Sequence, residues 1–378
     1  MILPTLGNRL REARLAAELS TRALAASLKT AGLQLSHVTL SKYERNESAP
    51  TTTTLAVIAA VLGKDPSWFE GESHALAGVR FRSLKSSPAR AKQSFVQTSL
   101  PWLRAYVHVH ALLRRTPPRG LRTAARPNEL GKRLAMRLRE AYKLGSYPIP
   151  SVVRILENSD IRVIEMDAID GIDAFAAQFG PHRVVVVNRR LSPDRMRLTL
   201  AHELGHVLYE DCMHDRPVNE HDIESRAFEF ASHLLIPDAE LAEAFALKSM
   251  VRLVHYKERF GVSLAAMVFR AKQDGLIAPL TAQRLWREFS KLGWRRQEPG
   301  RVPSDTPIRM ESLLDSALRQ KHASLAELAR VSGLSEEQIK VRILQAMGAT
   351  ELVKDDTDAP SFPMSAYRED GAAFGVHQ

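Results

Sequence analysis

The residues best suited to chemistry are His202, Glu203 and His206, which form the pattern His-Glu-x-x-His. Positions i and i+4 of a helix lie one turn apart on the same face, so both imidazoles can reach one metal ion. Glu203 lies one step around the helix, beside the metal rather than on it. The pattern predicts a zinc site on a helix, with Glu203 as the catalytic carboxylate that takes a proton from water and passes it on.

A catalytic zinc site also needs a third protein ligand and an open fourth position. Glu224 begins the sequence Glu-Ser-Arg-Ala on a second predicted helix, whose apolar residues would pack on the first. We therefore expect His202, His206 and Glu224 to be the metal ligands. The alternative is a helix that merely carries two histidines. The candidates for stabilising an oxyanion are Tyr209, His221 and His233.

The residues before this motif predict the elements that must position it. Ile161–Met166 alternates as a strand does, and Arg183–Asn188 contains four consecutive valines suited to a buried strand. Ser192 followed by Pro193 predicts the start of the helix that carries His202. The strand Arg183–Asn188 can pair with an extended substrate if its edge is free.

The first 78 residues predict a separate helical domain. Ser36 is a candidate N-cap for a helix from His37 to Tyr43, and Gly63 ends an apolar helix over Leu55–Leu62. This domain resembles the helix-turn-helix of the Xre/lambda-repressor family. The residues that carry the resemblance are Leu6–Gly7, Arg14, Leu24–Ala25, Ser36, Leu40–Ser41, Tyr43–Glu44–Arg45, Pro50 and Leu55–Leu62.

The resemblance implies that the second helix of the motif enters the major groove of DNA. Carried over by position, four side chains would face bases and Arg45 would meet phosphate. These four are His37, Val38, Thr39 and Lys42. The turn Lys29–Leu35 is longer than the usual three or four residues. A helical bundle without DNA contact is the alternative interpretation.

The stretch Ser192–Pro237 is similar to the ImmA/IrrE metallopeptidase family. The similarity rests on Ser-Pro-Asp-Arg at 192–195, Leu-Ala-His-Glu-Leu-Gly-His at 200–206 and Glu224 with the helix that follows it, through Pro237. Asp173-Ala174-Phe175 fits the same family, and Phe81-Arg82-Ser83-Leu84 matches a linker seen when an Xre domain precedes such a peptidase. The resemblance implies a regulatory zinc protease of helix-turn-helix repressors. Arg226 and Phe228 depart from the family pattern.

The composition describes a globular chain of 378 residues, 44% hydrophobic and 25% charged. A single cysteine, Cys212, excludes a disulfide framework and a cysteine-ligated metal site within one chain. No apolar run is long enough to span a bilayer, and Met1–Arg9 lacks the features of a signal peptide. We therefore expect a cytoplasmic protein without membrane contact.

Basic residues are concentrated in one segment of the chain. Residues 81–150 carry 15 Lys and Arg against 2 Asp and Glu. Such a segment favours a polyanionic partner. A solvated helical connector explains the same charges equally well.

The predicted fold is multidomain and mainly α, with an all-α helix-turn-helix domain, an α+β zincin-like domain with a small sheet, and a helical C-terminal region. The expected boundaries are 1–78 for the DNA-binding domain, 79–150 for a basic helical connector, 151–245 for the metallopeptidase domain, 246–354 for the C-terminal helices and 355–378 for a disordered tail.

Two functional hypotheses follow from these features. The first is a DNA-binding transcriptional regulator whose zinc-dependent endopeptidase domain cleaves a regulatory protein such as a repressor. The alternative is a DNA-binding regulator or antitoxin whose zincin domain is a non-proteolytic sensor or scaffold. The expected partners are DNA and a protein of the repressor or toxin type, and a homodimer is a further expectation.

Overall fold

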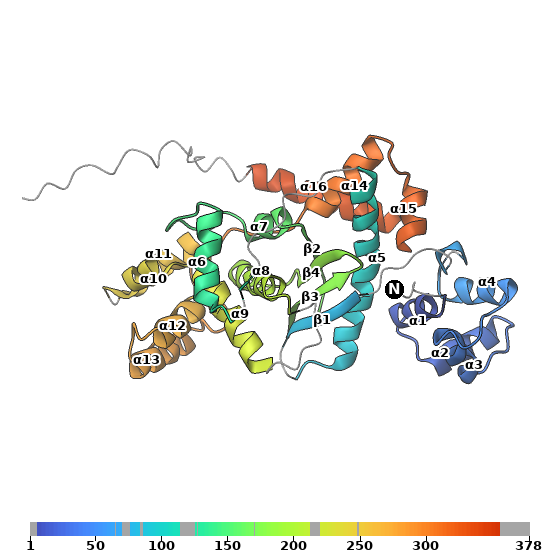
Figure 1. Cartoon of the computed structure of the whole chain (residues 1–378), viewed down its shortest axis with the longest axis horizontal. Helices are drawn as coiled ribbons and strands as arrows, with labels where there is room; N and C mark the ends of the chain where they lie inside the picture. Colours follow the sequence, from blue (N-terminus) through green and yellow to red (C-terminus); the bar gives the residue numbers. More distant parts are fainter. Residues whose placement is uncertain are drawn as a thin grey trace, which may run out of the picture.

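The computed structural model describes residues 6–64, 66–69, 76–83, 86–113, 125–126, 128–169, 171–211, 220–247 and 249–355. Helices dominate, and the strands form one small mixed sheet. The N-terminal helices lie at one end of the molecule, the sheet lies in the middle, and the helices of residues 238–291 form the other end (Figure 1). This arrangement confirms the predicted fold class.

The N-terminal domain is built from short helices around one apolar core. Leu10, Leu24, Leu40 and Ile58 are fully buried in that core. The side chains of three residues that precede helices, Ser20, Ser36 and Thr51, each accept a backbone N–H of the following turn. The elements are α1 (Leu6–Ala16), α2 (Thr21–Thr30), α3 (His37–Glu44), α4 (Thr52–Val61) and the 3-10 helix η1 (Pro66–Phe69).

The sheet has four strands in the order β1-β3-β4-β2. Its strands are β1 (Leu76–Ser83), β2 (Ile161–Met166), β3 (Ile172–Phe179) and β4 (His182–Asn188). β2 runs parallel to β4, whereas β3 runs antiparallel to both β4 and β1. The predicted strand Arg183–Asn188 is present, but its edge is not free, so the condition set for pairing with a substrate is not met. Its N–H and C=O groups are shared between two neighbouring strands, because β4 is an interior strand.

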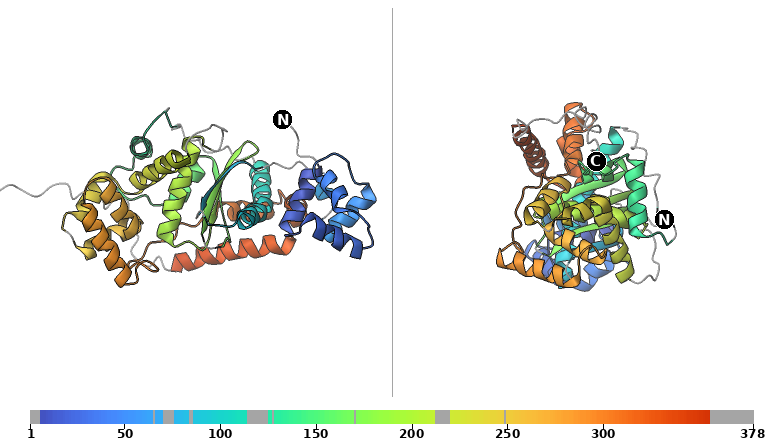
Figure 2. Two further views of the ribbon diagram at one scale, coloured as in Figure 1. Left: turned by 90° about the horizontal axis from the view of Figure 1, so that it is seen from below. Right: turned by 90° about the vertical axis from the view of Figure 1, so that its left-hand side faces the viewer.

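Both faces of the sheet are covered, which explains the valine run. The side chains of a strand alternate between faces, so Val185 and Val187 pack towards α8 (Pro193–Leu208) while Val184 and Val186 pack towards α5 (Ala89–Leu112). All four are fully buried. When the sheet is viewed nearly edge-on, α8 and α5 lie on opposite sides of it (Figure 2).

The segment expected to be a connector contributes to the middle of the molecule. Its described residues supply most of β1, the helix α5 and the helix α6 (Gly131–Ala141), which packs on α9 (Glu220–Leu235). α7 (Val152–Asn158) then leads into β2. Residues 114–124, with several of the arginines, lie outside the described part of the chain.

The remaining helices lie on two sides of the sheet domain (Figure 1). One group consists of α10 (Asp238–Phe245), α11 (Met250–Phe260), α12 (Leu264–Gln273) and α13 (Pro279–Lys291). The other consists of α14 (Arg309–Arg319), α15 (Leu325–Ser332) and α16 (Glu336–Asp355), of which α14 and α15 contact α5. The predicted disordered tail falls, but for Asp355, outside the described residues. None of the described helices is both long and apolar enough to cross a membrane.

The crossing of α6 over α9 provides a test of the packing. A Cβ atom at Gly131 would lie 2.5 Å from the Arg226 carbonyl oxygen and 2.5 Å from the Phe230 nitrogen. Both neighbours are backbone atoms, so Gly131→Ala should lower the free energy of unfolding by about 1–3 kcal/mol. Chemical denaturation measures this. Gly348→Ala is the control, because its Cβ would meet nothing within 4 Å, and equal stability of the two variants would contradict this packing.

Candidate metal centre

Three side-chain groups from two helices converge on one point. The Nε2 atoms of His202 and His206 lie 3.0 Å apart on α8. Glu224 of α9 places Oε2 3.1 Å from His202 Nε2 and Oε1 3.3 Å from His206 Nε2. Two imidazole nitrogens and a carboxylate at this spacing form a donor set suited to zinc. The three predicted ligands therefore lie together.

Gly205 allows the two helices to approach closely enough for this arrangement. A Cβ atom at position 205 would lie 3.0 Å from the Phe230 ring and 3.3 Å from the Cα atom of Ala227. Ala227 and Phe230 are fully buried against α8. The glycine within the His-Glu-x-x-His motif therefore brings α9, and with it Glu224, against the two histidines.

Glu203 is buried completely, and neither carboxylate oxygen has a hydrogen-bond partner in the described part of the protein. His202 Nδ1 is likewise buried without a partner there. Burial raises the pKa of Glu203 to about 7, with the nearby His206 and Arg82 opposing that rise. Buried polar atoms normally have partners, so these groups fit a centre that is completed by a metal ion and water.

A second layer of side chains orients His206. Its Nδ1 lies 3.0 Å from Asp211 Oδ2, and Arg226 donates a hydrogen bond to the other oxygen of Asp211. The Arg226 guanidinium also lies over the ring of Tyr209, 4.3 Å from its centroid. Arg226, which departs from the family pattern, therefore holds the carboxylate that orients a candidate ligand. The sequence analysis did not single out Asp211.

The environment separates the pKa values of the two histidines. Burial lowers the pKa of His202 to about 3. Burial alone would also lower that of His206, but hydrogen bonds with Asp211 and Glu224 raise it to about 9. The pKa of Glu224 is held well below its usual range by hydrogen bonds from both histidines, against the effect of burial.

The centre opens into a cleft of about 1010 Å³. Arg82 of β1 and Asp173 of β3 line it, with Arg82 Nε 3.7 Å from Asp173 Oδ2. Arg195 of α8 also pairs with Asp173, at 2.9 Å. Phe228 of α9, the other departure from the family, packs edge-on against Phe269 at the same cleft. The sequence resemblance included Arg82 and Asp173 but gave them no role.

The three oxyanion candidates are placed differently. Tyr209 does not line the cleft, and its hydroxyl donates to the Glu129 carbonyl, 3.1 Å away. His221 and His233 line it. His233 Nδ1 lies 2.7 Å from Asp238 Oδ1, and Arg270 bonds to both residues. Arg270 therefore bonds to the members of a second cluster of histidine and carboxylate groups. Its positive charge makes that cluster unsuited to a metal ion.

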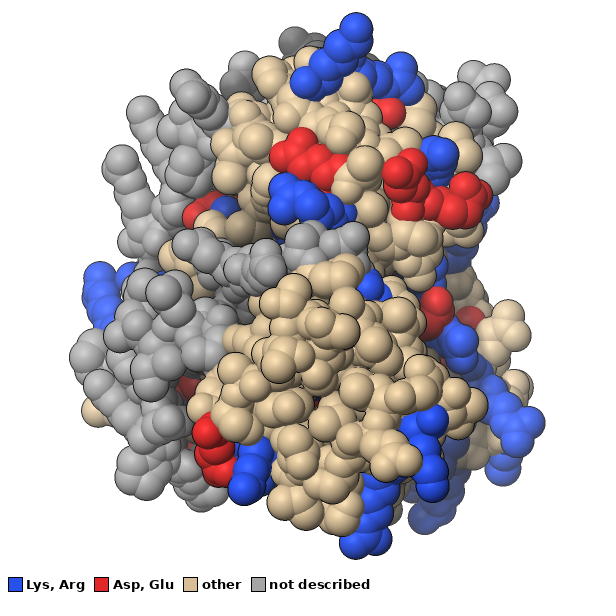
Figure 3. All heavy atoms as spheres, turned by 90° about the vertical axis from the view of Figure 1, so that its right-hand side faces the viewer, with Lys and Arg blue, Asp and Glu red and all other residues tan. Residues whose placement is uncertain are grey.

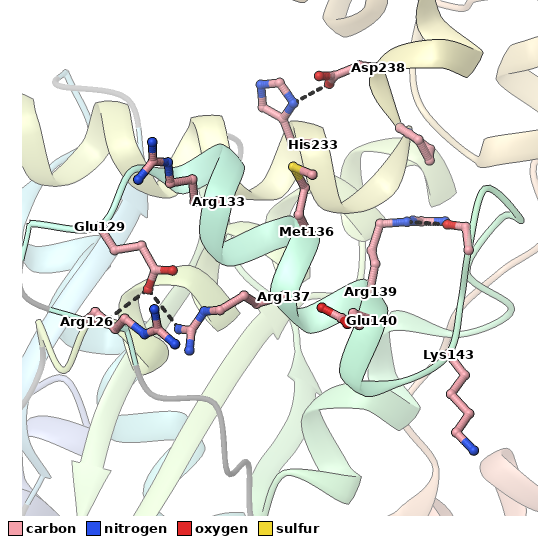
Figure 4. A pocket seen from close by; sticks show the side chains of 12 residues that line it. Arg126, Glu129, Arg133, Met136, Arg137, Arg139, Glu140, Lys143, His233 and Asp238 are labelled. Atoms are coloured by element: carbon pink, nitrogen blue, oxygen red, sulfur yellow. Dashed lines mark hydrogen bonds and ion pairs between the residues drawn. The ribbon is translucent and has the colours of Figure 1, made fainter.

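A separate cavity of about 830 Å³ lies along α6 and is lined by several cations (Figure 4). Two of these cations are engaged within the protein. Arg137 pairs with Glu129 at 2.8 Å, and Arg139 donates to the carbonyls of Gly145, Leu234 and Tyr147. This part of the basic segment therefore contributes to folding, because its cations hold α6 to neighbouring elements.

The predicted DNA contacts lie on or after α3. His37, Val38 and Lys42 are exposed, with 50% of Val38 accessible, whereas Thr39 is partly buried. Arg45 is exposed and pairs with Glu47 at 2.5 Å. Lys and Arg side chains gather along the lower margin of the helix-turn-helix end of the molecule (Figure 3). The six residues between α2 and α3 keep the turn longer than usual.

Comparison with known families matches two segments of the chain. Residues 10–69 match a helix-turn-helix family, and residues 156–272 match the IrrE N-terminal-like domain, a peptidase family. The second match covers β3, β4, α8 and α9 and therefore the whole ligand cluster. No curated protein matches the chain.

The hydrogen bond to His206 predicts the effect of Asp211→Asn. An amide orients and polarises the imidazole less well than a carboxylate, so zinc affinity should fall about 10- to 100-fold. Competition with a chromophoric chelator measures this. Asp222→Asn, at an exposed position on α9, is the control, and equal affinities of the two variants would remove Asp211 from the centre.

The raised pKa of His206 predicts that metal binding releases a proton. A ligating imidazole must be neutral, and His206 in the metal-free protein keeps its proton until the pH approaches about 9. The apparent zinc affinity should therefore rise with pH between about 6 and 9 and then level off. Calorimetry in buffers of different ionisation enthalpy counts the protons, and an affinity that does not change with pH would contradict the assignment.

Proposed function

The chain joins an Xre-type helix-turn-helix to an IrrE/ImmA-like peptidase domain, and we propose that it is a DNA-binding transcriptional regulator that cleaves a regulatory protein. The substrate class we propose is a repressor or another protein with which the regulator acts. His202, His206 and Glu224 would hold a zinc ion, and Glu203 would be the catalytic carboxylate. We place the DNA-binding domain at 1–78 and the peptidase core at 151–245.

Proton transfer by Glu203 is the central step of the proposed mechanism. When bound, zinc supplies Lewis-acid polarisation of water and of the scissile carbonyl. Glu203 takes a proton from the attacking water and passes it to the leaving amine. A pKa near 7 suits a group that must both accept and donate a proton near neutrality. Asp211 keeps His206 in one orientation while this occurs.

The observation that carries the proposal is Glu203 itself. It is fully buried beside the ligand cluster, and its oxygens have no partner among the described residues. Burying a carboxylate in this way destabilises the fold. A sensor or scaffold that only holds zinc has no use for it, which favours the peptidase over the non-proteolytic alternative.

Glu203→Gln tests the peptidase directly. The variant keeps the shape of the side chain but cannot take a proton, so cleavage of a repressor encoded beside the gene should fall at least 100-fold. Zinc content and DNA binding should stay unchanged. Mass spectrometry of the incubated repressor gives the readout. A wild-type protein that holds zinc but cleaves neither itself nor the repressor would favour the sensor alternative.

Lys42→Ala tests the DNA-binding face. If the exposed ammonium contacts DNA, the variant should bind DNA more weakly. The slope of the logarithm of affinity against the logarithm of salt concentration should also fall in magnitude by about one. Fluorescence anisotropy with the promoter of the chain's own gene, at several salt concentrations, measures both. Lys340→Ala, exposed on α16, is the matched control. Equal salt dependence of the two variants would place DNA elsewhere.

A further inference from the structure

β1 occupies the edge of β3 beside the candidate metal centre. It pairs antiparallel with β3, from Leu76 opposite Phe179 to Ser83 opposite Ile172. β3 is also the strand whose Asp173 lines the cleft. Extended peptides bind sheets by adding a strand at an edge. The edge of β3 is already filled by a segment of the same chain.

β1 also directs two cations towards the centre. Arg80 and Arg82 are two residues apart and so lie on the same face of the strand. Arg80 Nε donates to the carbonyl of Asp211, 2.8 Å away. Arg82 lines the cleft with His202 and Glu224 and lies 3.7 Å from Asp173. A peptide that approaches the ligands along β3 would have to displace these contacts.

β1 is the most exposed strand of the sheet. None of its residues is fully buried, whereas β3 is buried at all but one position. The pairing is irregular between Ala77 and Arg80 and again between Arg82 and Ser83. Besides the contacts of Arg80 and Arg82, an aromatic contact between Phe81 and Phe175, with ring centroids 5.6 Å apart, holds β1 on β3. Elements with few buried contacts open most easily.

We propose that β1 is a built-in competitor of the substrate and occupies the edge of β3 until an extended protein segment displaces it. The inference rests on the proposed peptidase function, because it names the strand that receives the substrate. The proposal also connects the peptidase site with the DNA-binding domain. Only residues 70–75 separate β1 from η1 of the DNA-binding domain, so the segment that leaves the site is tied to the domain that binds DNA.

A reversible disulfide tests the exchange. Ala77 and Gln178 are register partners at the end of the strands opposite to Asp173. Antiparallel partners have Cα atoms about 4.5–5.5 Å apart, within the range that a disulfide spans. We would introduce Ala77→Cys and Gln178→Cys into full-length protein that also carries Cys212→Ser and Glu203→Gln. The probe is a fluorescein-labelled synthetic peptide with the sequence of Leu76–Ser83.

The reduced protein should bind the peptide at least tenfold more tightly than the oxidised protein, as measured by fluorescence anisotropy. The two forms are the same polypeptide, so each is the control for the other. Equal binding by both forms would overturn the proposal, because the peptide would then use the outer edge of β1 or another site. Cleavage is not needed for this readout, so failure of the peptidase function is distinguished from failure of the exchange.

Phe81→Ala tests the same exchange from the other direction. Loss of the anchoring ring should increase amide hydrogen exchange across β1 and strengthen peptide binding at least threefold. Phe95→Ala is the control, because Phe95 contacts the same Phe175 ring from α5. Unchanged protection of β1 in Phe81→Ala, or equal gains in both variants, would overturn the proposal. The disulfide experiment decides the matter if either alanine variant fails to fold.

Discussion

The close packing of α9 on α8 at Gly205 is the contact on which the candidate centre depends. His202 and His206 need only one regular helix, but Glu224 comes from another helix. A side chain at position 205 would press on Phe230 and Ala227 and would separate the two helices. Burying the two imidazoles carries a desolvation cost, which their contacts with the half-exposed Glu224 carboxylate offset. Asp211 stabilises the buried His206 in the same way, and Arg226 in turn stabilises the Asp211 carboxylate.

The sheet packs against α8 and through it supports α9. One strand of this sheet, β1, comes from outside the segment that matches the peptidase family. The family match begins at residue 156, whereas β1 ends at Ser83. α5 follows β1 and buries the face of the sheet opposite to α8. The described part of the basic segment thus becomes a strand and two helices of the middle of the molecule, with arginines that pair internally. The charge of the segment by itself did not predict these packed elements.

The DNA-binding domain is attached to the same framework. Glu12 of α1 pairs with Arg104 of α5, and Lys64 donates to the Gly333 carbonyl at 2.7 Å. Trp68 lies among the cations of Arg9, Lys64 and Arg104, each within about 5.5 Å of its ring. These contacts are made by the buried side of the domain. The exposed residues of α3 are not among them.

The sequence by itself determined the local features of this protein. The i, i+4 spacing of His202 and His206, the cap at Ser36 and the valine run of β4 depend on neighbours within one or two turns of chain. Local geometry of this kind is fixed by helix and strand periodicity. The bounds of α5 were not predicted: this helix begins at Ala89 and continues through Pro101, where burial against the sheet outweighs the effect of proline.

Tertiary structure alone decided which strand lies at the edge and which charges meet. β4 has the sequence of a buried strand, but only the pairing of β3 and β2 on its two sides removes it as a substrate edge. Arg82 and Asp173 are about ninety residues apart, as are Arg104 and Glu12, and no local period relates them. Such contacts depend on how whole elements pack. The packing therefore placed β1 over the centre, although the sequence had already singled out its last residues, Phe81, Arg82 and Ser83.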